Sequence, residues 1–340
     1  MEAFTTISGQ LKMLSDERVL ALVEKAKPLH VGIDGKSYAL TLGENRIFVK
    51  KIPLSDLELE SGNIKSTANL YRLPLFCEYV IGAPGFGSWR ELAANEKATK
   101  WVLSGQCENF SLLYEWRVSA NSQRANPMSE EQMENLEKQV QFWENSSSVR
   151  DRYLALHDPA AEIIMFLEYV PQTLFSWLKK QFQLGHEAFD QALIFTETNL
   201  NSTISFMKNR GLVHFDTHFE NILTDGERLY FNDFGLALSS DFDLNEEELR
   251  FLAEHQDYDL CRASVGFMHA LITSTFGDED WKENLRKILN TNCEELTSTG
   301  QALAKKYGPV AVELLDFSQK LKNESKRTPY PSERISKLLV

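Results

Sequence analysis

The sequence predicts an α+β fold of two lobes, in which a strand-rich first part is followed by a mainly helical second part. The chain has 340 residues, more than one hydrophobic core usually serves, so two lobes are expected. From about residue 30 to 54, glycines separate short apolar runs, as in β-strands. EIIMFLEYV at 162–170 has the pattern of a buried strand, and the chain after residue 175 is mainly helical in pattern.

The composition excludes several classes of protein. A net charge of -13 argues against a general nucleic-acid binder or a protein that coats anionic membranes. No run of 18 apolar residues appears, so we expect no membrane insertion. The four cysteines are scattered and form no C-x-x-C pair, which favours reduced thiols and a cytoplasmic location.

Helices are predicted at three places in the first part of the chain. Residues 15–27 form an amphipathic pattern within an N-terminal helical extension over 1–28. SWRELAANEKATKWVL forms a second helix, for which Ser88 and Glu91 have capping-box spacing. The polar stretch 119–150 is predicted to insert an acidic helix between two strands, as a surface decoration or as a substrate or partner element. A further insert over 54–87 is expected to hold a hairpin around YRLPLFCEYVIG.

The segment NILTDGERLYFN predicts a β-hairpin with a two-residue type I′ turn at Asp225-Gly226. That register places Asn221 opposite Tyr230 and brings Asn221 and Asp233 to the open end of the hairpin, with Asp216 just before it. Two carboxylates in one apolar neighbourhood repel unless a cation or a proton intervenes. Carboxylate and amide oxygens are ligands that suit Mg²⁺, which also keeps waters and phosphate oxygens.

HFDTHFENIL followed by NDFGLA resembles the catalytic loop and the D-F-G motif of the protein kinase-like superfamily. The resemblance implies a two-lobed kinase-like fold, with an antiparallel-sheet N-lobe over 29–170 that contains one key helix, and a helical C-lobe over 171–340. It implies that Asp216 orients or deprotonates an acceptor hydroxyl, while Asn221 and Asp233 hold Mg²⁺ on the phosphates of ATP.

The resemblance extends to the strand IFVKKI, where Lys50 corresponds to the phosphate-binding lysine and Lys51, on the opposite face, is its competitor. For the helical glutamate that pairs with this lysine we favour Glu96 over Glu91. The capping role already accounts for Glu91, whereas an unpaired Glu96 in the apolar stripe of the helix would be costly.

Other positions follow from the same resemblance. GIDGKSYAL suggests a glycine-rich loop in which Gly32 and Gly35 lie near the phosphates, although an ordinary β-turn explains these letters equally well. MFLEYVPQTLFSWL resembles the hinge, where backbone groups of Glu168 and Val170 would pair with adenine. Asp259 would brace the catalytic loop.

Departures from the family pattern bear on the acceptor. Phe215 stands where many protein kinases have arginine, so we expect no activation by loop phosphorylation, and no A-P-E segment follows DFGLA. His218 resembles the loop of aminoglycoside and choline phosphotransferases, while DFGLA and LEYV resemble protein kinases. Three hypotheses remain open: an ATP-dependent phosphotransferase acting on a hydroxyl of a small molecule, an atypical protein serine/threonine kinase, and a pseudokinase that binds a nucleotide or a partner.

Overall fold

The computed structural model describes residues 2–32, 35–79, 81–121, 124, 127–277, 279–290 and 293–339. The chain is an α+β protein, 54% helical and 16% strand. It divides into two compact units, the first made of Met1–Val170 with Phe234–Leu249 and the second of Pro171–Asp233 with Arg250–Val340. The stretch after Asp233 therefore belongs to the strand-rich unit, although the sequence suggested the helical part.

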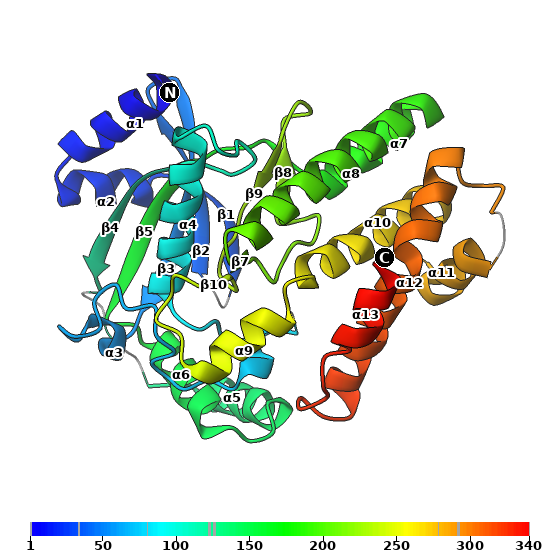
Figure 1. Cartoon of the computed structure of the whole chain (residues 1–340). Helices are drawn as coiled ribbons and strands as arrows, with labels where there is room; N and C mark the ends of the chain where they lie inside the picture. Colours follow the sequence, from blue (N-terminus) through cyan, green and yellow to red (C-terminus); the bar gives the residue numbers. More distant parts are fainter. Residues whose placement is uncertain are drawn as a thin grey trace. The chain divides into compact units, whose positions relative to one another are not determined.

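The first unit is built on a five-stranded antiparallel sheet in the order β1-β2-β3-β5-β4 (Figure 1). Its strands are β1 (Lys27–Gly32), β2 (Gly35–Leu42), β3 (Asn45–Leu54), β4 (Leu113–Ala120) and β5 (Ala161–Glu168). The strands predicted near 30–54 and 162–170 are confirmed. The sheet places β3 in the centre, between β2 and β5.

Helices cover both faces of this sheet. On one face lie α1 (Glu2–Met13) and α2 (Asp16–Glu24), whose apolar side chains pack with Val49, Ile164 and Phe166. On the other face lies α4 (Ser88–Leu103), which packs Trp89 and Leu92 against Ile52, Ile163 and Met165. Successive side chains of a strand point to opposite faces. The alternation along β3 therefore directs Lys50 to the α4 face and Lys51 to the α1–α2 face.

Of the predictions for the two inserts of the first unit, the one for residues 119–150 is confirmed and the one for residues 54–87 is wrong. Between β4 and β5 lie α5 (Glu130–Phe142) and α6 (Ser147–His157), so the predicted inserted helix is confirmed, with both hydrogen bonds of the capping box between Ser129 and Gln132. The hairpin expected within 54–87 is wrong. That stretch contains the short helix α3 (Asp56–Leu59) and the 3-10 helix η1 (Leu75–Glu78), joined by turns and irregular backbone.

The strand β10 (Leu238–Ser239) completes the elements of the first unit, and α9 (Glu246–Glu254) crosses the division at Leu249.

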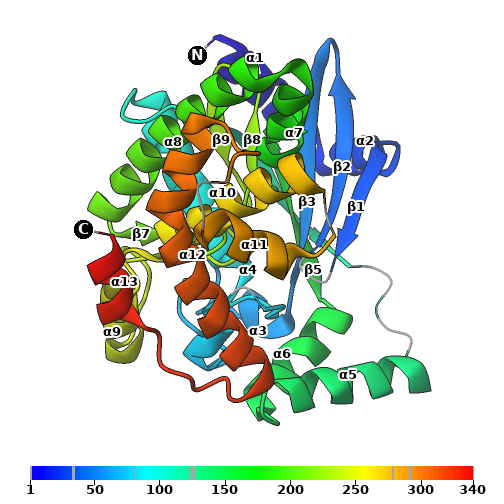
Figure 2. The ribbon, with the colours of Figure 1, turned by 90° about the vertical axis from the view of Figure 1, so that its right-hand side faces the viewer.

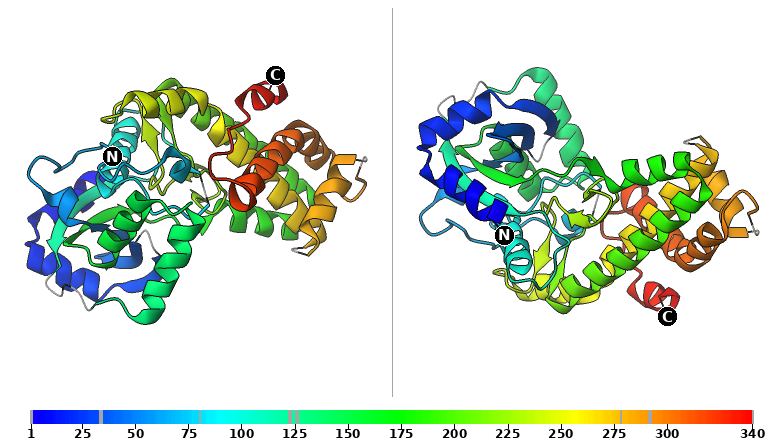
Figure 3. Two further views of the ribbon diagram at one scale, coloured as in Figure 1. Left: turned by 90° about the horizontal axis from the view of Figure 1, so that it is seen from below. Right: turned by 90° about the horizontal axis from the view of Figure 1, so that it is seen from above.

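The second unit is mainly helical. Its helices are α7 (Leu174–Leu184), α8 (His186–Asn209), α10 (Tyr258–Phe276), α11 (Trp281–Asn290), α12 (Ser298–Asn323) and α13 (Ser332–Leu338). Figure 2 and Figure 3 show α10 and α12 lying side by side. Its strands are β6 (Gln172–Thr173), β7 (Leu212–Val213), β8 (Ile222–Thr224) and β9 (Leu229–Phe231), and β6, β8 and β9 form a small sheet. Within the described part of the chain, no helix combines the length and the apolar character needed to cross a bilayer.

Candidate functional site

The hairpin of the second unit has a longer connection than predicted. Thr224 pairs with Leu229, so four residues link β8 and β9 instead of two. The cause is the side chain of Asp225, whose Oδ1 accepts hydrogen bonds of 2.9 Å from the backbone N–H groups of both Glu227 and Arg228. A carboxylate that caps two successive N–H groups stabilises a wider turn than type I′. The two-residue turn is therefore wrong, and the register shifts by two residues.

The shifted register still gathers the predicted polar residues. Asn221 faces Asn232, not Tyr230, and its carbonyl accepts the Asn232 N–H at 3.2 Å. Asp233 is therefore the residue just beyond the ladder, where it adopts a left-handed φ of 60°. The Nδ2 of Asn221 donates to Oδ2 of Asp216 at 2.9 Å. The loop and the hairpin thus bring Asp216, Asn221 and Asp233 into one neighbourhood.

The Asp216 carboxyl is strongly perturbed. Burial raises its pKa to about 6, while the positive charge of Arg262 opposes the rise and the negative charge of Asp233 adds to it. Its Oδ2 accepts from Asn221, but no described residue donates a hydrogen bond to its buried Oδ1. A buried carboxylate oxygen without a donor is costly, and each such atom in a native structure calls for an explanation. Oδ1 is therefore the position in the loop that favours a hydroxyl donor from a ligand.

A second aspartate holds the backbone of the loop, as predicted. The carboxylate of Asp259, at the start of α10, accepts the N–H groups of His214 and Phe215 at 2.8 Å each. Its carbonyl also accepts the Thr217 hydroxyl at 2.8 Å. Phe215 has a φ of 64°, which is unfavourable for a bulky residue and requires such support. Asp259 thus fixes the residue that directly precedes Asp216.

The side chain of Phe215 makes packing contacts within the second unit. Its ring is fully buried and lies 5.0 Å from the ring of Tyr258 and 5.7 Å from that of Phe251, in a stacked arrangement with the latter. A ring enclosed in this way offers no cation to a phosphorylated loop. In the first unit, Ser239 is fully buried, and its hydroxyl accepts a hydrogen bond from Lys97 at 2.8 Å.

Arg262 is the residue of this site that the sequence analysis missed. Its Nη2 lies 3.7 Å from Oδ1 of Asp216. It stands three residues after Asp259 on the same helix, a spacing that places both side chains on one face. Once Asp259 had been assigned to the loop, this spacing was a signal that could have identified Arg262.

His218, like Arg262, lies near Oδ1 of Asp216. Its Nδ1 accepts the Glu220 N–H at 3.2 Å, so the proton of the neutral ring is on Nε2, which lies 3.4 Å from Oδ1 of Asp216. Burial, with the nearby charge of Arg262, lowers the pKa of His218 to about 4. His218 is therefore neutral at physiological pH and adds no charge to the site.

The donor set suits a cation that is only partly held by protein. Because the Asn221 amide nitrogen faces Asp216, its oxygen points away from that carboxylate and can bind a metal beside Asp233. No group of three His, Cys, Asp or Glu side chains among the described residues could form a metal site by itself. One carboxylate and one amide fit Mg²⁺, which takes its remaining ligands from water and phosphate.

In the first unit the sheet and α4 form a buried ion pair. Lys50, on the α4 face of β3, lies 2.8 Å from Oε1 of Glu91, and the two side chains are only 9% and 5% exposed. The predicted pairing of Lys50 with Glu96 is therefore wrong. Glu96 is 36% exposed, and its Oε1 accepts from the indole of Trp116 at 3.2 Å.

Contacts at the start of α4 explain why Glu91 is available to pair with Lys50. The capping box of Ser88 and Glu91 does not form, because Gly87 is the N-cap residue and no side chain caps the helix. Instead, the Ser88 N–H donates to Oε1 of the buried Glu58 at 2.9 Å. Glu91 is thus released from capping and lies on a buried side of the helix, opposite Lys50.

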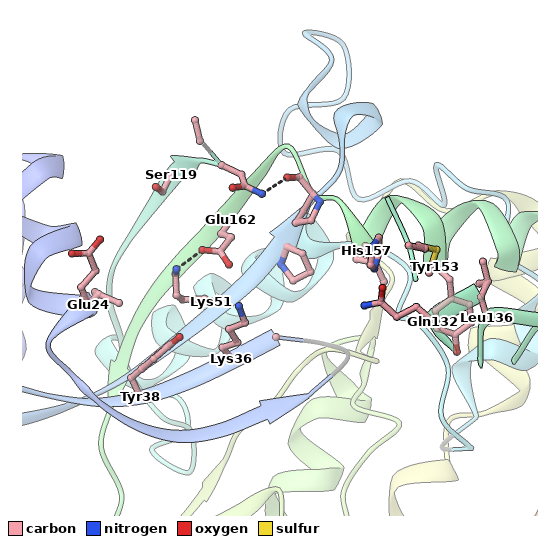
Figure 4. A pocket seen from close by; sticks show the side chains of 18 of the residues that line it. Glu24, Lys36, Tyr38, Lys51, Ser119, Gln132, Leu136, Tyr153, His157 and Glu162 are labelled. Carbon is pink, nitrogen blue, oxygen red and sulfur yellow. Dashed lines mark hydrogen bonds and ion pairs between the residues drawn. The ribbon is translucent and has the colours of Figure 1, made fainter. Parts of the chain in front are cut away.

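Lys51 lies on the opposite face and has a different environment. It pairs with Glu162 of β5, and both line a cavity of about 1380 Å³ between the sheet and the helices α2, α5 and α6 (Figure 4). Tyr38, Gln132 and His157 project toward the same space. The structure therefore separates the two lysines, and Lys50 is the one that contacts a helical glutamate.

The predicted glycine-rich loop and hinge have structural roles of their own. Gly35 has a φ of 141°, and a Cβ there would lie 2.2 Å from the Lys51 carbonyl, so the close approach of β2 to β3 requires glycine. Gly32 pairs with Gly35 at the end of the ladder, and residues 33–34 between them lie outside the described residues. Glu168 ends β5 and donates its N–H to the Leu112 carbonyl at 2.8 Å, while Val170 is the last residue before the division of the units.

No known protein-family model matches this chain, and no curated protein matches its sequence.

Proposed function

We propose that this protein is an ATP- and Mg²⁺-dependent phosphotransferase that transfers the γ-phosphate to a hydroxyl of a small molecule. The observation that carries the proposal is the Asp216 carboxylate. One of its oxygens is fixed by Asn221, and the other is buried with no hydrogen-bond donor among the described residues. An acceptor hydroxyl supplies that donor, and binding there orients its oxygen for attack.

The transfer step follows from these positions. A lone pair of the acceptor oxygen forms a bond to the γ-phosphorus, while the bond between that phosphorus and its bridging oxygen breaks and leaves its electron pair on ADP. The hydroxyl proton passes to Asp216, whose pKa of about 6 leaves it mostly ionised at neutral pH and yet basic enough to accept a proton. Mg²⁺ bound by Asn221 and Asp233 would neutralise charge on the phosphates.

Lys50 contributes to this proposal through the family resemblance and through its ion pair. A lysine held at 2.8 Å by a buried glutamate has a fixed ammonium group, as a phosphate contact requires. In this proposal Glu91, not Glu96, positions the Lys50 ammonium group. The four cysteines are scattered along the sequence and form no C-x-x-C pair, which favours the reducing, cytoplasmic location that is part of the proposal.

Nucleotide titration calorimetry tests the metal part of this proposal. We expect the parent protein to bind ATP more tightly with Mg²⁺ than without it. Asp233→Ala should lose most of that difference, whereas Glu220→Ala, an exposed carboxylate of the same loop, should retain it. If ATP binding depended on Mg²⁺ equally in Asp233→Ala and in the parent, Asp233 would not be a metal ligand and the proposed metal site would be contradicted.

A further inference from the structure

The second unit contains a cavity of about 400 Å³ that borders the catalytic loop. It lies among the start of α7, the face of α10 and the start of α11, and its walls include Phe175, His218, Arg262, Val265, His269 and Trp281. This volume is in the range of sites for small organic ligands. It is large enough for one ring with a short side chain.

The cavity is preformed by buried packing. Phe219 forms part of its wall and is fixed by an edge-to-face contact of 5.2 Å with Phe267 and by its carbonyl, which accepts the Phe175 N–H at 3.1 Å. Gly266 lies against this ring so closely that a Cβ would approach it to 2.6 Å. A wall held in this way loses little freedom when a ligand binds.

The walls select for a flat and mainly apolar molecule. The rings of Phe175 and His269 stack at 4.6 Å with an interplanar angle of 16°, and the indole of Trp281 and the side chain of Val265 add further apolar surface. The charged groups that line the cavity are one guanidinium, Arg262, and one carboxylate, Glu220. Since these are of opposite sign, the lining favours a ligand without net charge.

Two residues of the cavity wall lie next to the Asp216 carboxylate. His218 and Arg262 both line the cavity, and their Nε2 and Nη2 atoms lie 3.4 Å and 3.7 Å from the same oxygen, Oδ1 of Asp216. Neither atom makes a hydrogen bond to that oxygen. Asp216 does not itself line the cavity and its Oδ1 is buried, so a hydroxyl that extends from the cavity reaches this oxygen where His218 and Arg262 move apart.

We propose that this cavity binds the body of the acceptor and that the acceptor is an uncharged aromatic alcohol whose hydroxyl reaches Oδ1 of Asp216. This inference rests on the proposed function, because the cavity assigns the acceptor of the same transfer step. The ring would lie against Phe175 and Trp281. Offset ring contacts of this kind add to the free energy gained by burying the ring itself.

The test is ligand-observed NMR with 2-phenylethanol as the probe, with glycerol and a serine-containing hexapeptide for comparison. We expect saturation transfer to the phenyl protons of the probe, and a much weaker signal for glycerol. Val265→Trp should fill the cavity and weaken binding of the probe by about tenfold or more. Ser274→Trp, at a half-buried position of the same helix that does not line the cavity, is the matched control and should bind the probe as the parent does.

A second measurement separates this inference from the proposed function. Phosphorylated product is detected by mass spectrometry after each alcohol is incubated with the protein and Mg-ATP. Probe binding that Val265→Trp weakens, without any product, would support the cavity and contradict the transfer reaction. Product from glycerol or the peptide that Val265→Trp does not affect would support transfer and overturn the cavity assignment. Absence of binding by 2-phenylethanol at millimolar concentration would also overturn it.

Discussion

Replacing Arg262 with glutamine removes a guanidinium whose Nη2 lies 3.7 Å from Oδ1 of Asp216. At that separation, two unit charges attract by about 1 kcal/mol in water and by about 4 kcal/mol at an effective dielectric constant near 20. Asp216 is 17% exposed, so the relevant value lies between these limits. Since one pH unit corresponds to about 1.4 kcal/mol, the loss should raise the pKa of Asp216 by about 1–3 pH units.

The direct assay is ¹³C NMR of the aspartate carboxyl groups as a function of pH. Asp216→Asn assigns the signal, and a chelator keeps cations away, because a metal beside Asn221 would itself lower the pKa. We expect a midpoint of about 6 in the parent and a clearly higher midpoint in Arg262→Gln. Arg286→Gln, an equal change of charge at an exposed position of α11, should leave the midpoint unchanged. A midpoint in Arg262→Gln that equals that of the parent would refute the electrostatic account of this site.

Three further changes test other parts of the structure. Glu91→Gln should weaken ATP binding by about tenfold, because Lys50 loses its ionic contact, whereas Glu96→Gln should have little effect, and calorimetry compares them. Asp259→Asn should destabilise the second unit by about 1–3 kcal/mol, because its amide offers one acceptor to two buried N–H groups, and thermal unfolding measures the loss. Burial raises the pKa of the Asp216 carboxyl from 3.8 to about 6, so its ionised form destabilises the folded state at pH 7.5. Asp216→Asn removes that charge and should stabilise the fold at pH 7.5 by at most about 3 kcal/mol. Well below pH 4 the carboxyl is protonated in both the folded and the unfolded state, so the gain should vanish. A destabilised Asp216→Asn at pH 7.5 would contradict the raised pKa.

The sequence was sufficient to predict the elements with strong periodicity. The strands of the sheet, the helix beginning at Ser88 and the helix capped by Ser129 each have a clear local pattern, and each forms. The bracing role of Asp259 was also predicted, from the resemblance of DYDLCRASVGFMHAL to a helix that begins with a structural aspartate.

Two features could not be predicted from the sequence: the hairpin register and the helical partner of Lys50. The first depends on one side chain that changes the turn, and the second on a contact between residues far apart in the chain. The register of the hairpin was changed by Asp225, whose carboxylate caps two N–H groups and widens the turn. The partner of Lys50 was misassigned because the true ligand of the Ser88 N–H is Glu58, 30 residues earlier in the chain. No local pattern distinguishes a glutamate that caps its helix from one released by such a contact.

The measurement that tests the central claim most directly is the mass-spectrometric detection of γ-phosphate transfer from Mg-ATP to a panel of hydroxyl compounds that includes the protein itself. The parent should form a phosphorylated product together with ADP. Asp216→Asn should still bind Mg-ATP but lose product formation by several orders of magnitude. Phosphorylated serine or threonine on the protein alone would favour the protein-kinase alternative. Equal product formation by Asp216→Asn and the parent, or no product at all from a parent that binds Mg-ATP, would contradict the account.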